Sequence, residues 1–130
     1  MEQMKILLTG AFQYDEKHIT EIENLGLKVD LLKYENKTVE NPEKYDAVVC
    51  NGLFLHNDIE KFKNLKYIQL TSAGLDRVPM NYIRGNNIII NNARGVYLSL
   101  IHIYFKSLKT VSWSAETKSI LFINRKVGML

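Results

Sequence analysis

Short apolar segments alternate along this chain with polar stretches of helical character, and this order restricts the fold more than any other feature. One segment, residues 47–50, is apolar on both faces, which is typical of a central strand. Strands that alternate with helices predict a parallel sheet. We therefore expect an α/β fold, a flavodoxin-like three-layer domain with a five-stranded parallel sheet. The expected strands are residues 6–8, 29–32, 47–50, 67–70 and 88–90.

The polar stretch after the first strand has the marks of a helix at both ends. Asp15 can cap its start, Ile19, Ile22 and Leu25 recur at threefold spacing, and Gly26 can supply a left-handed stop. Two shorter helices are expected. Residues 57–62 form the beginning of one, and the other includes Tyr82 and Ile83.

The length and charge of the chain limit the classes of function. A chain of 130 residues with 46% hydrophobic content is expected to form about one domain. The net charge of +3 arises in the C-terminal part, because residues 98–130 hold five of the 17 basic residues and one of the 14 acidic residues. The rest of the chain has mixed charges. This distribution argues against nucleic-acid binding, which needs clustered basic residues on one face.

Nothing in the sequence predicts a membrane segment or secretion. No apolar run approaches the roughly 20 residues that span a bilayer, and the N-terminus lacks a signal-peptide pattern. Cys50 is the single cysteine, which suits a reducing compartment. We expect a cytoplasmic protein without a membrane partner.

In an open parallel sheet, ligands bind beyond the carboxyl ends of the strands, so the turns that follow the strands are the candidate sites. The small residues Ser72, Ala73 and Gly74 leave backbone amides uncovered, and such amides can hold a carboxylate or a phosphate. The alternative is an ordinary turn in which Ser72 or Asp76 caps a helix, and spacing alone favours it. The candidate turns are residues 9–11, 51–53, 71–74 and 91–93.

Two stretches of the chain resemble the substrate domain of the D-isomer-specific 2-hydroxyacid dehydrogenases. The first is residues 65–76, a strand followed by a Ser-Ala-Gly-apolar-Asp turn, and the second is residues 87–95, a strand that ends in Asn before a small-residue loop. The resemblance covers roughly residues 4 to 97. We therefore interpret residues 1–97 as a partial substrate domain.

This resemblance implies a function and a set of site residues. Members of the family interconvert a 2-oxo acid and a D-2-hydroxy acid with NAD or NADP, and an intact member is expected to be a homodimer. Asp76 is expected to be structural. The residues implied to face the small acid substrate are Asn51, Gly52, Leu53, Ser72, Ala73 and Gly74.

The catalytic and cofactor-binding parts of such an enzyme cannot be assigned in this chain. No segment has the G-x-G-x-x-G pattern after a strand, and no family Arg, Glu or His can be identified. His18 is expected on an exposed helix face, His56 in a loop and His102 in the C-terminal segment, without partners at metal-ligand spacing. Cys50 is interpreted as a core residue. We expect an inactive fragment that binds no cofactor or metal.

Other proteins share this fold. A receiver domain needs acidic residues after its first and third strands, where this chain has Thr9-Gly10 and Asn51-Gly52, and a flavodoxin needs a hydroxyl-rich phosphate loop. The remaining alternative is a stand-alone module that binds small carboxylates without catalysis.

Residues 98–130 depart from the family pattern. Residues 98–103 have the sequence that CTGTCTCTTATACACATCT, a transposon end used in sequencing, encodes in one frame. Its length is not a multiple of three, so its insertion would shift the frame. Permitted codons for residues 118–130, shifted by one frame, give an aromatic, Gln and Trp pattern similar to that of the family. We interpret residues 98–130 as an adapter-derived, frame-shifted tail. The alternative is natural structure, with Ile101, Tyr104, Phe105 and Leu108 on one helical stripe and a strand at residues 120–123.

Overall fold

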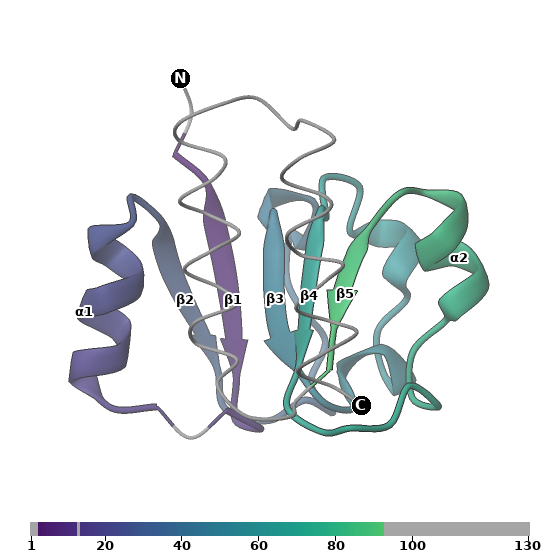
Figure 1. Cartoon of the computed structure of the whole chain (residues 1–130), viewed down its shortest axis with the longest axis horizontal. Coiled ribbons are helices and arrows are strands. Elements are labelled where there is room, and N and C mark those ends of the chain that lie inside the picture. The colour runs from purple at the N-terminus through teal and green to yellow at the C-terminus, as the bar shows by residue number, and fades with distance from the viewer. Residues whose placement is uncertain (1–2, 13, 93–130) are drawn as a thin grey trace.

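The computed structural model describes residues 3–12 and 14–92, which form one five-stranded sheet (Figure 1). The strand order is β2-β1-β3-β4-β5, and every pair of neighbours is parallel. This order is flavodoxin-like, as predicted. The strands are β1 Lys5–Thr9, β2 Lys28–Leu32, β3 Ala47–Cys50, β4 Tyr67–Leu70 and β5 Ile89–Asn91.

The strands lie where the sequence pattern predicted them, and their first and last residues differ from the expected ones by at most one position. β5 begins one residue later than expected, because the N–H of Ile88 donates to the carbonyl of Ile83 at 3.1 Å and closes the preceding helix. The N–H of Ile89 then pairs with the carbonyl of Lys66 at 3.0 Å. Asn87 accommodates the change of direction with a left-handed φ of 56°. Pairing therefore starts only after the helix has been capped.

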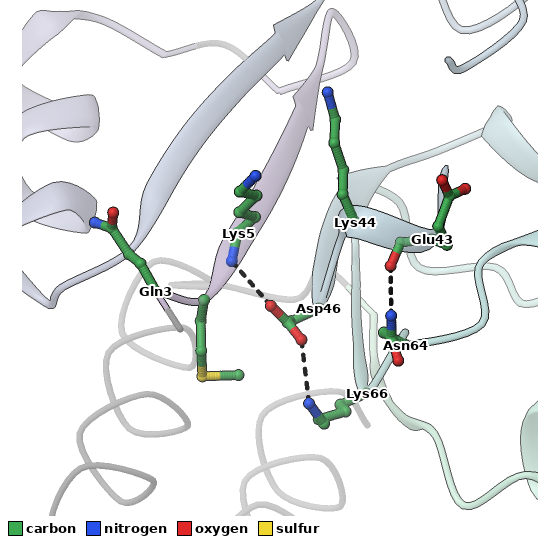
Figure 2. A pocket seen from close by; sticks show the side chains of 8 residues that line it. Gln3, Lys5, Glu43, Lys44, Asp46, Asn64 and Lys66 are labelled. Carbon is green, nitrogen blue, oxygen red and sulfur yellow. Dashed lines mark hydrogen bonds and ion pairs between the residues drawn. The ribbon is translucent and has the colours of Figure 1, made fainter. Parts of the chain in front are cut away.

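The amino ends of the central strands are joined by one carboxylate, that of Asp46, just before β3. Its Oδ2 accepts from the N–H of Lys5 at 3.0 Å, and its Oδ1 accepts from Nζ of Lys66 at 3.1 Å (Figure 2). The backbone of Asp46 also bonds both neighbours, donating to Lys5 O and accepting from the N–H of Lys66. Asp46 thus ties β1, β3 and β4 together at this edge.

A hollow of about 770 Å³ lies at the same edge of the sheet. The charged residues that line it are of both signs. The carboxylate of Asp46 is bound by Lys66 (Figure 2). Lys44 lies 3.6 Å from Asp30, so its charge is also partly balanced. The hollow therefore presents no concentrated charge to a ligand.

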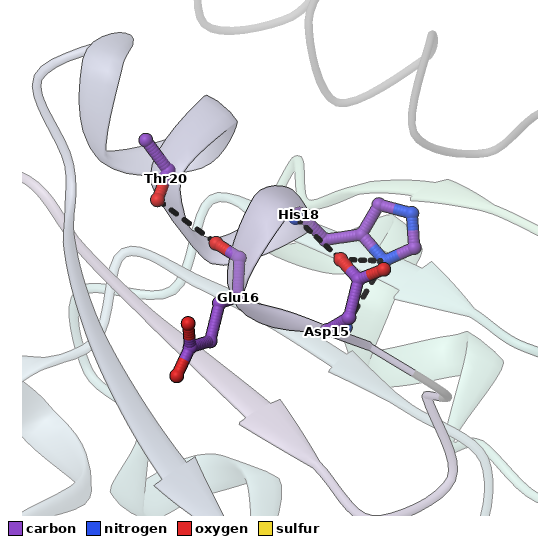
Figure 3. A network of polar contacts seen from close by, with 4 residues as sticks. All are labelled: Asp15, Glu16, His18 and Thr20. Carbon is purple, nitrogen blue, oxygen red and sulfur yellow. Dashed lines mark hydrogen bonds and ion pairs between the residues drawn. The ribbon is translucent and has the colours of Figure 1, made fainter.

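The helix α1, Glu16–Asn24, packs on one face of the sheet and is capped as predicted. Oδ1 of Asp15 accepts from the N–H of His18 at 3.0 Å, and the N–H of Asp15 donates to Nδ1 of His18 at 3.3 Å (Figure 3). The hydrogen bond from His18 lowers the pKa of Asp15 below its ordinary value of 3.8. Gly26 has the expected left-handed φ, 92°. His18 is half-buried and belongs to this cap, rather than standing on an exposed face.

The other face of the sheet is covered by α2, Met80–Gly85, and by short 3₁₀ turns. The helix expected from Asn57 is a single turn, because the Asn57 side chain accepts from the N–H of Val39 and donates to the carbonyl of Lys37. Asp58 caps the turn instead, accepting from the N–H of Glu60 at 2.9 Å. The 3₁₀ turns are η1 Pro42–Lys44, η2 Leu53–Leu55 and η3 Ile59–Lys61.

Two hydrophobic clusters fill the space on either side of the sheet, which gives the predicted three layers. Ile22 of α1 packs with Ile6, Leu8 and Val49 on one face. Ile83 of α2 packs on the other face in the cluster that includes Leu7, Val48 and Ile68. The alternation of the strands thus sends successive apolar side chains to opposite cores.

Within residues 3–12 and 14–92, no helix combines the length and apolarity that a membrane crossing requires. The expected boundary at Tyr97 and the interpretation of residues 98–130, including His102, lie outside the described residues.

Candidate functional site

The parallel register brings the turns after β3 and β4 together at the carboxyl edge of the sheet. Cys50 and Leu70 are register partners, and the N–H of Thr71 donates to the carbonyl of Cys50 at 3.0 Å. One residue further along each chain segment, Oγ of Ser72 donates to Oδ1 of Asn51 at 2.8 Å. The structure thus places two of the predicted site residues in direct contact.

A carboxylate that the sequence reasoning missed, that of Glu35, lies at the centre of this edge. Its Oε2 accepts from Oγ1 of Thr9 at 2.8 Å and from the N–H of Asn51 at 2.7 Å, and its Oε1 accepts from the N–H of Gly52 at 2.8 Å. The three donors come from the ends of β1 and β3, whereas Glu35 follows β2. Of the described ion pairs, none involves Glu35. Its charge is held by N–H and O–H donors.

The third residue of the predicted loop, Leu53, lies in the core cluster that also holds Cys50, and both side chains are fully buried. Burial raises the pKa of the Cys50 thiol, and the negative charge of Glu35 raises it further. The backbone N–H groups of Asn51 and Gly52 thus both donate to the protein's own Glu35.

The turn after β4 differs from that loop in having unused donors. Within the described part of the chain, the backbone N–H groups of Ser72, Ala73 and Gly74 have no hydrogen-bond acceptor. Ala73 and Gly74 are exposed. The turn is nevertheless fixed, because Nδ2 of Asn92 donates to the carbonyl of Ala73 at 2.6 Å. No acceptor among residues 3–12 and 14–92 therefore competes with a ligand for these three N–H groups.

The alternative role for this turn, capping of a helix, is not what the structure contains. α2 begins at Met80 after Pro79, and no side chain caps its first turn. The Ser72 hydroxyl is directed to Asn51, and the exposed Asp76 lies beside Gly74, where an added Cβ would meet Oδ1 of Asp76 at 2.8 Å. A side chain at Gly74 would therefore require the exposed Asp76 side chain to move.

A buried polar cluster supports the strands that lead to this edge. The Tyr67 hydroxyl donates to Oε1 of Gln69 and accepts from Nδ2 of Asn91 at 3.2 Å, and all three residues are fully buried. Burial raises the pKa of Tyr67, so its hydroxyl stays neutral and can donate. Asn91 belongs to this cluster in the core, so its side chain does not line an open turn.

The turn after β1 does not fit a dinucleotide. An added Cβ on Gly10 would meet the carbonyl oxygen of Lys33 at 1.9 Å, so protein backbone fills the space that a pyrophosphate would need. The first turn of α1 carries Glu16 and is capped by the Asp15 carboxylate, both of which repel a phosphate. The turn after β1 therefore lacks the open, uncapped helix start of a dinucleotide-binding turn.

The other candidates considered in the sequence were a metal-ligand cluster, the histidines and Cys50. Within residues 3–12 and 14–92, no three His, Cys, Asp or Glu side chains gather as metal ligands would. His56 is exposed at the end of η2. Cys50 is fully buried, in agreement with its interpretation as a core residue.

The structure is an α/β domain in which predicted site residues from two turns meet at the carboxyl edge of a parallel sheet. The family model described as "D-isomer specific 2-hydroxyacid dehydrogenase, catalytic domain" matches residues 6–99. The chain belongs to this family of dehydrogenases. No curated protein sequence matches the chain.

Solved structures agree with the fold. A 3-phosphoglycerate dehydrogenase of Entamoeba histolytica with bound NAD⁺ has a TM-score of 0.54 and 20% identity, over 72% of this chain and 34% of that one. An NADPH-dependent glyoxylate/hydroxypyruvate reductase of Sinorhizobium meliloti in complex with citrate has a TM-score of 0.53 and 13% identity, over 71% and 29%. The chain thus spans about a third of the length of each of these structures.

Proposed function

We propose that residues 1–97 are the substrate side of an NAD- or NADP-dependent enzyme that interconverts a 2-oxo acid and a D-2-hydroxy acid. The observation that carries this proposal is the match of residues 6–99 to the catalytic domain of the family. Of the similar structures, one is named as a dehydrogenase with bound NAD⁺ and one as an NADPH-dependent reductase. Their names support the cofactor class, and the choice between NAD and NADP stays open.

The substrate carboxylate is proposed to bind at the turn of Ser72, Ala73 and Gly74. Three N–H groups without an acceptor among the described residues, on a turn fixed by Asn51 and Asn92, match the needs of a carboxylate. The family resemblance also implies Asn51, Gly52 and Leu53, and the amides of Asn51 and Gly52 would contribute only if they exchanged Glu35 for the ligand.

The cofactor is proposed to bind outside the described residues, since the turn after β1 does not fit it. NAD or NADP supplies or accepts the hydride, and residues of the described chain hold and orient the acid. We therefore expect no turnover by the 130-residue chain on its own. The proposed domain boundary near Tyr97 and the frame-shifted tail account for this expectation.

The test begins with resequencing of the gene from its source. A locus that encodes residues 98–103 without the adapter would refute the frame-shift proposal. The full-length product should reduce pyruvate, glyoxylate or hydroxypyruvate with NADH or NADPH, with the 130-residue chain as the control. No reduction of any 2-oxo acid by the full-length product would refute the proposed function.

A further inference from the structure

We propose that Glu35 is a positioning residue, an internal carboxylate ligand that occupies the amides after β3 and directs an anionic ligand to the turn after β4. The identity of that ligand as a small carboxylate rests on the proposed function. The role of Glu35 in the loop rests on the geometry alone.

The three bonds to Glu35 connect the segment after β2 with the ends of β1 and β3, next to the backbone bond from Gly10 N–H to the Leu32 carbonyl. Glu35 belongs to the segment after β2, Thr9 ends β1, and Asn51 and Gly52 follow β3. Bonds from N–H and O–H donors to an ionised carboxylate are stronger than neutral ones. One carboxylate therefore fixes the relative positions of three strand ends.

Occupancy by Glu35 decides where a second carboxylate can bind. A backbone N–H has one hydrogen to donate, and those of Asn51 and Gly52 donate to Glu35 at 2.7 and 2.8 Å. A ligand carboxylate in the same place would also meet the charge of Glu35. At the exposed turn of Ala73 and Gly74 the backbone donors have no acceptor among the described residues, and the carboxylate beside Gly74, that of Asp76, is exposed to water.

The same network extends from Glu35 to that turn. Glu35 holds the backbone of Asn51, and Oδ1 of Asn51 accepts from the Ser72 hydroxyl at 2.8 Å. Loss of Glu35 would free the Asn51 backbone and loosen its contact with Ser72. Without Glu35, we thus expect an anion to bind more weakly at residues 72–74 and to bind newly at residues 51–52.

Chemical rescue of the full 130-residue chain tests the proposal. Glu35→Ala leaves three donors without their acceptor, and we expect a Tm lower by about 10 °C. Acetate at about 100 mM should restore several degrees, because it supplies a carboxylate to the vacated amides. Wild type and Glu40→Ala, a variant at an exposed glutamate of the same connecting segment, should show no such gain. Equal gains in all three proteins would overturn the proposal.

Glu35→Gln provides the second variant, because it keeps the size of the side chain but presents an amide. We expect it to lose Tm as well and not to be rescued by acetate, since its side chain still fills the space. Amide resonances of Asn51 and Gly52 should shift with acetate in Glu35→Ala only. If Glu35→Gln matched wild type in Tm and in these resonances, the charged carboxylate would have no role and the proposal would fail.

Titration of wild type with malonate separates this proposal from the proposed function. We expect the amide resonances of residues 72–74 to shift in wild type, and to shift at severalfold higher malonate in Glu35→Ala. Shifts at residues 51–52 of wild type would show that Glu35 does not exclude anions and would overturn the positioning role. An inactive full-length enzyme would refute the proposed function, whereas acetate rescue of Glu35→Ala would stand.

Discussion

The two edges of the sheet are each tied together by one carboxylate, but the two carboxylates have different surroundings. Asp46, at the amino edge, bonds the N–H of Lys5 and the ammonium of Lys66. Glu35, at the carboxyl edge, bonds two backbone N–H groups and a hydroxyl, with no cation among its described partners. Asp46 therefore joins strands through an ion pair. Glu35 is bound by backbone N–H and hydroxyl donors, the kind of donors that bind anionic ligands.

The difference indicates which edge tolerates substitution. The Lys66 side chain is 50% exposed, so its attraction to Asp46 is screened by water. Thr9 is fully buried and Glu35 is half-buried, so donors left unsatisfied there are costly. We expect changes at the carboxyl edge to have larger effects than matched changes at the amino edge.

The largest expected effect concerns Cys50, which lies beneath the carboxyl edge. Its burial and the nearby charge of Glu35 raise the thiol pKa, so little reactive thiolate forms. We expect iodoacetamide to label the native chain at least about 100-fold more slowly than the urea-unfolded chain. Mass spectrometry over time measures both rates. Native labelling at the unfolded rate would show that the carboxyl edge opens freely and would break the comparison.

Removal of the buried hydroxyl at the carboxyl edge should have the next largest effect. Thr9→Val keeps the shape of the side chain but removes the donor to Glu35, and we expect unfolding free energy to fall by about 1–2 kcal/mol. Thr9→Ser, which keeps the hydroxyl, is the matched control. Urea denaturation measures both, and equal losses would show that packing rather than the hydrogen bond is responsible.

The corresponding change at the amino edge should cost less. Asp46→Asn keeps an oxygen for the N–H of Lys5 but loses the attraction to Lys66, and we expect a loss of about 0.5 kcal/mol. Lys66→Met tests the same ion pair from its other side. A loss in Asp46→Asn greater than that of Thr9→Val, in the same urea assay, would reverse the ranking of the two edges.

The smallest effect is expected at Asp15, whose side chain is 68% exposed. Its folded pKa is below the ordinary value of 3.8, so the ionised cap stabilises the fold above that pH and loses its contribution as pH falls through the folded pKa. Asp15→Asn keeps a capping oxygen without the charge. Wild type should be slightly more stable than Asp15→Asn at neutral pH, and the difference in Tm should vanish in acid. A difference that grew toward low pH would contradict this assignment.

The sequence predicted the sheet because its strands are short apolar runs bounded by turn residues, a signal local to each strand. The cap at Asp15 and the stop at Gly26 were equally readable, since both act on adjacent backbone. The helix expected from residue 57 is only a single turn, because the Asn57 side chain bonds a segment 18 to 20 residues away. Local patterns thus predict elements and not the contacts between them.

The candidate site was predictable in part for the same reason. The turns at residues 51–53 and 71–74 follow apolar strands, so their meeting at one edge follows from parallel pairing. Glu35 had no motif, and two of its three partners are backbone amides 16 and 17 residues away. Backbone donors leave no side-chain signature, so only the folded chain could reveal this network.

The packing of Gly10 has a consequence for protein engineering. Its N–H donates to the carbonyl of Leu32 at 2.9 Å, and a Cβ would lie 1.9 Å from the carbonyl oxygen of Lys33. Any side chain at this position would force β2 away from β1. In a library that randomises the first turn to create nucleotide affinity, variants with a substitution at Gly10 would therefore fail to fold and be lost. Such affinity is better added by fusing a separate nucleotide-binding module.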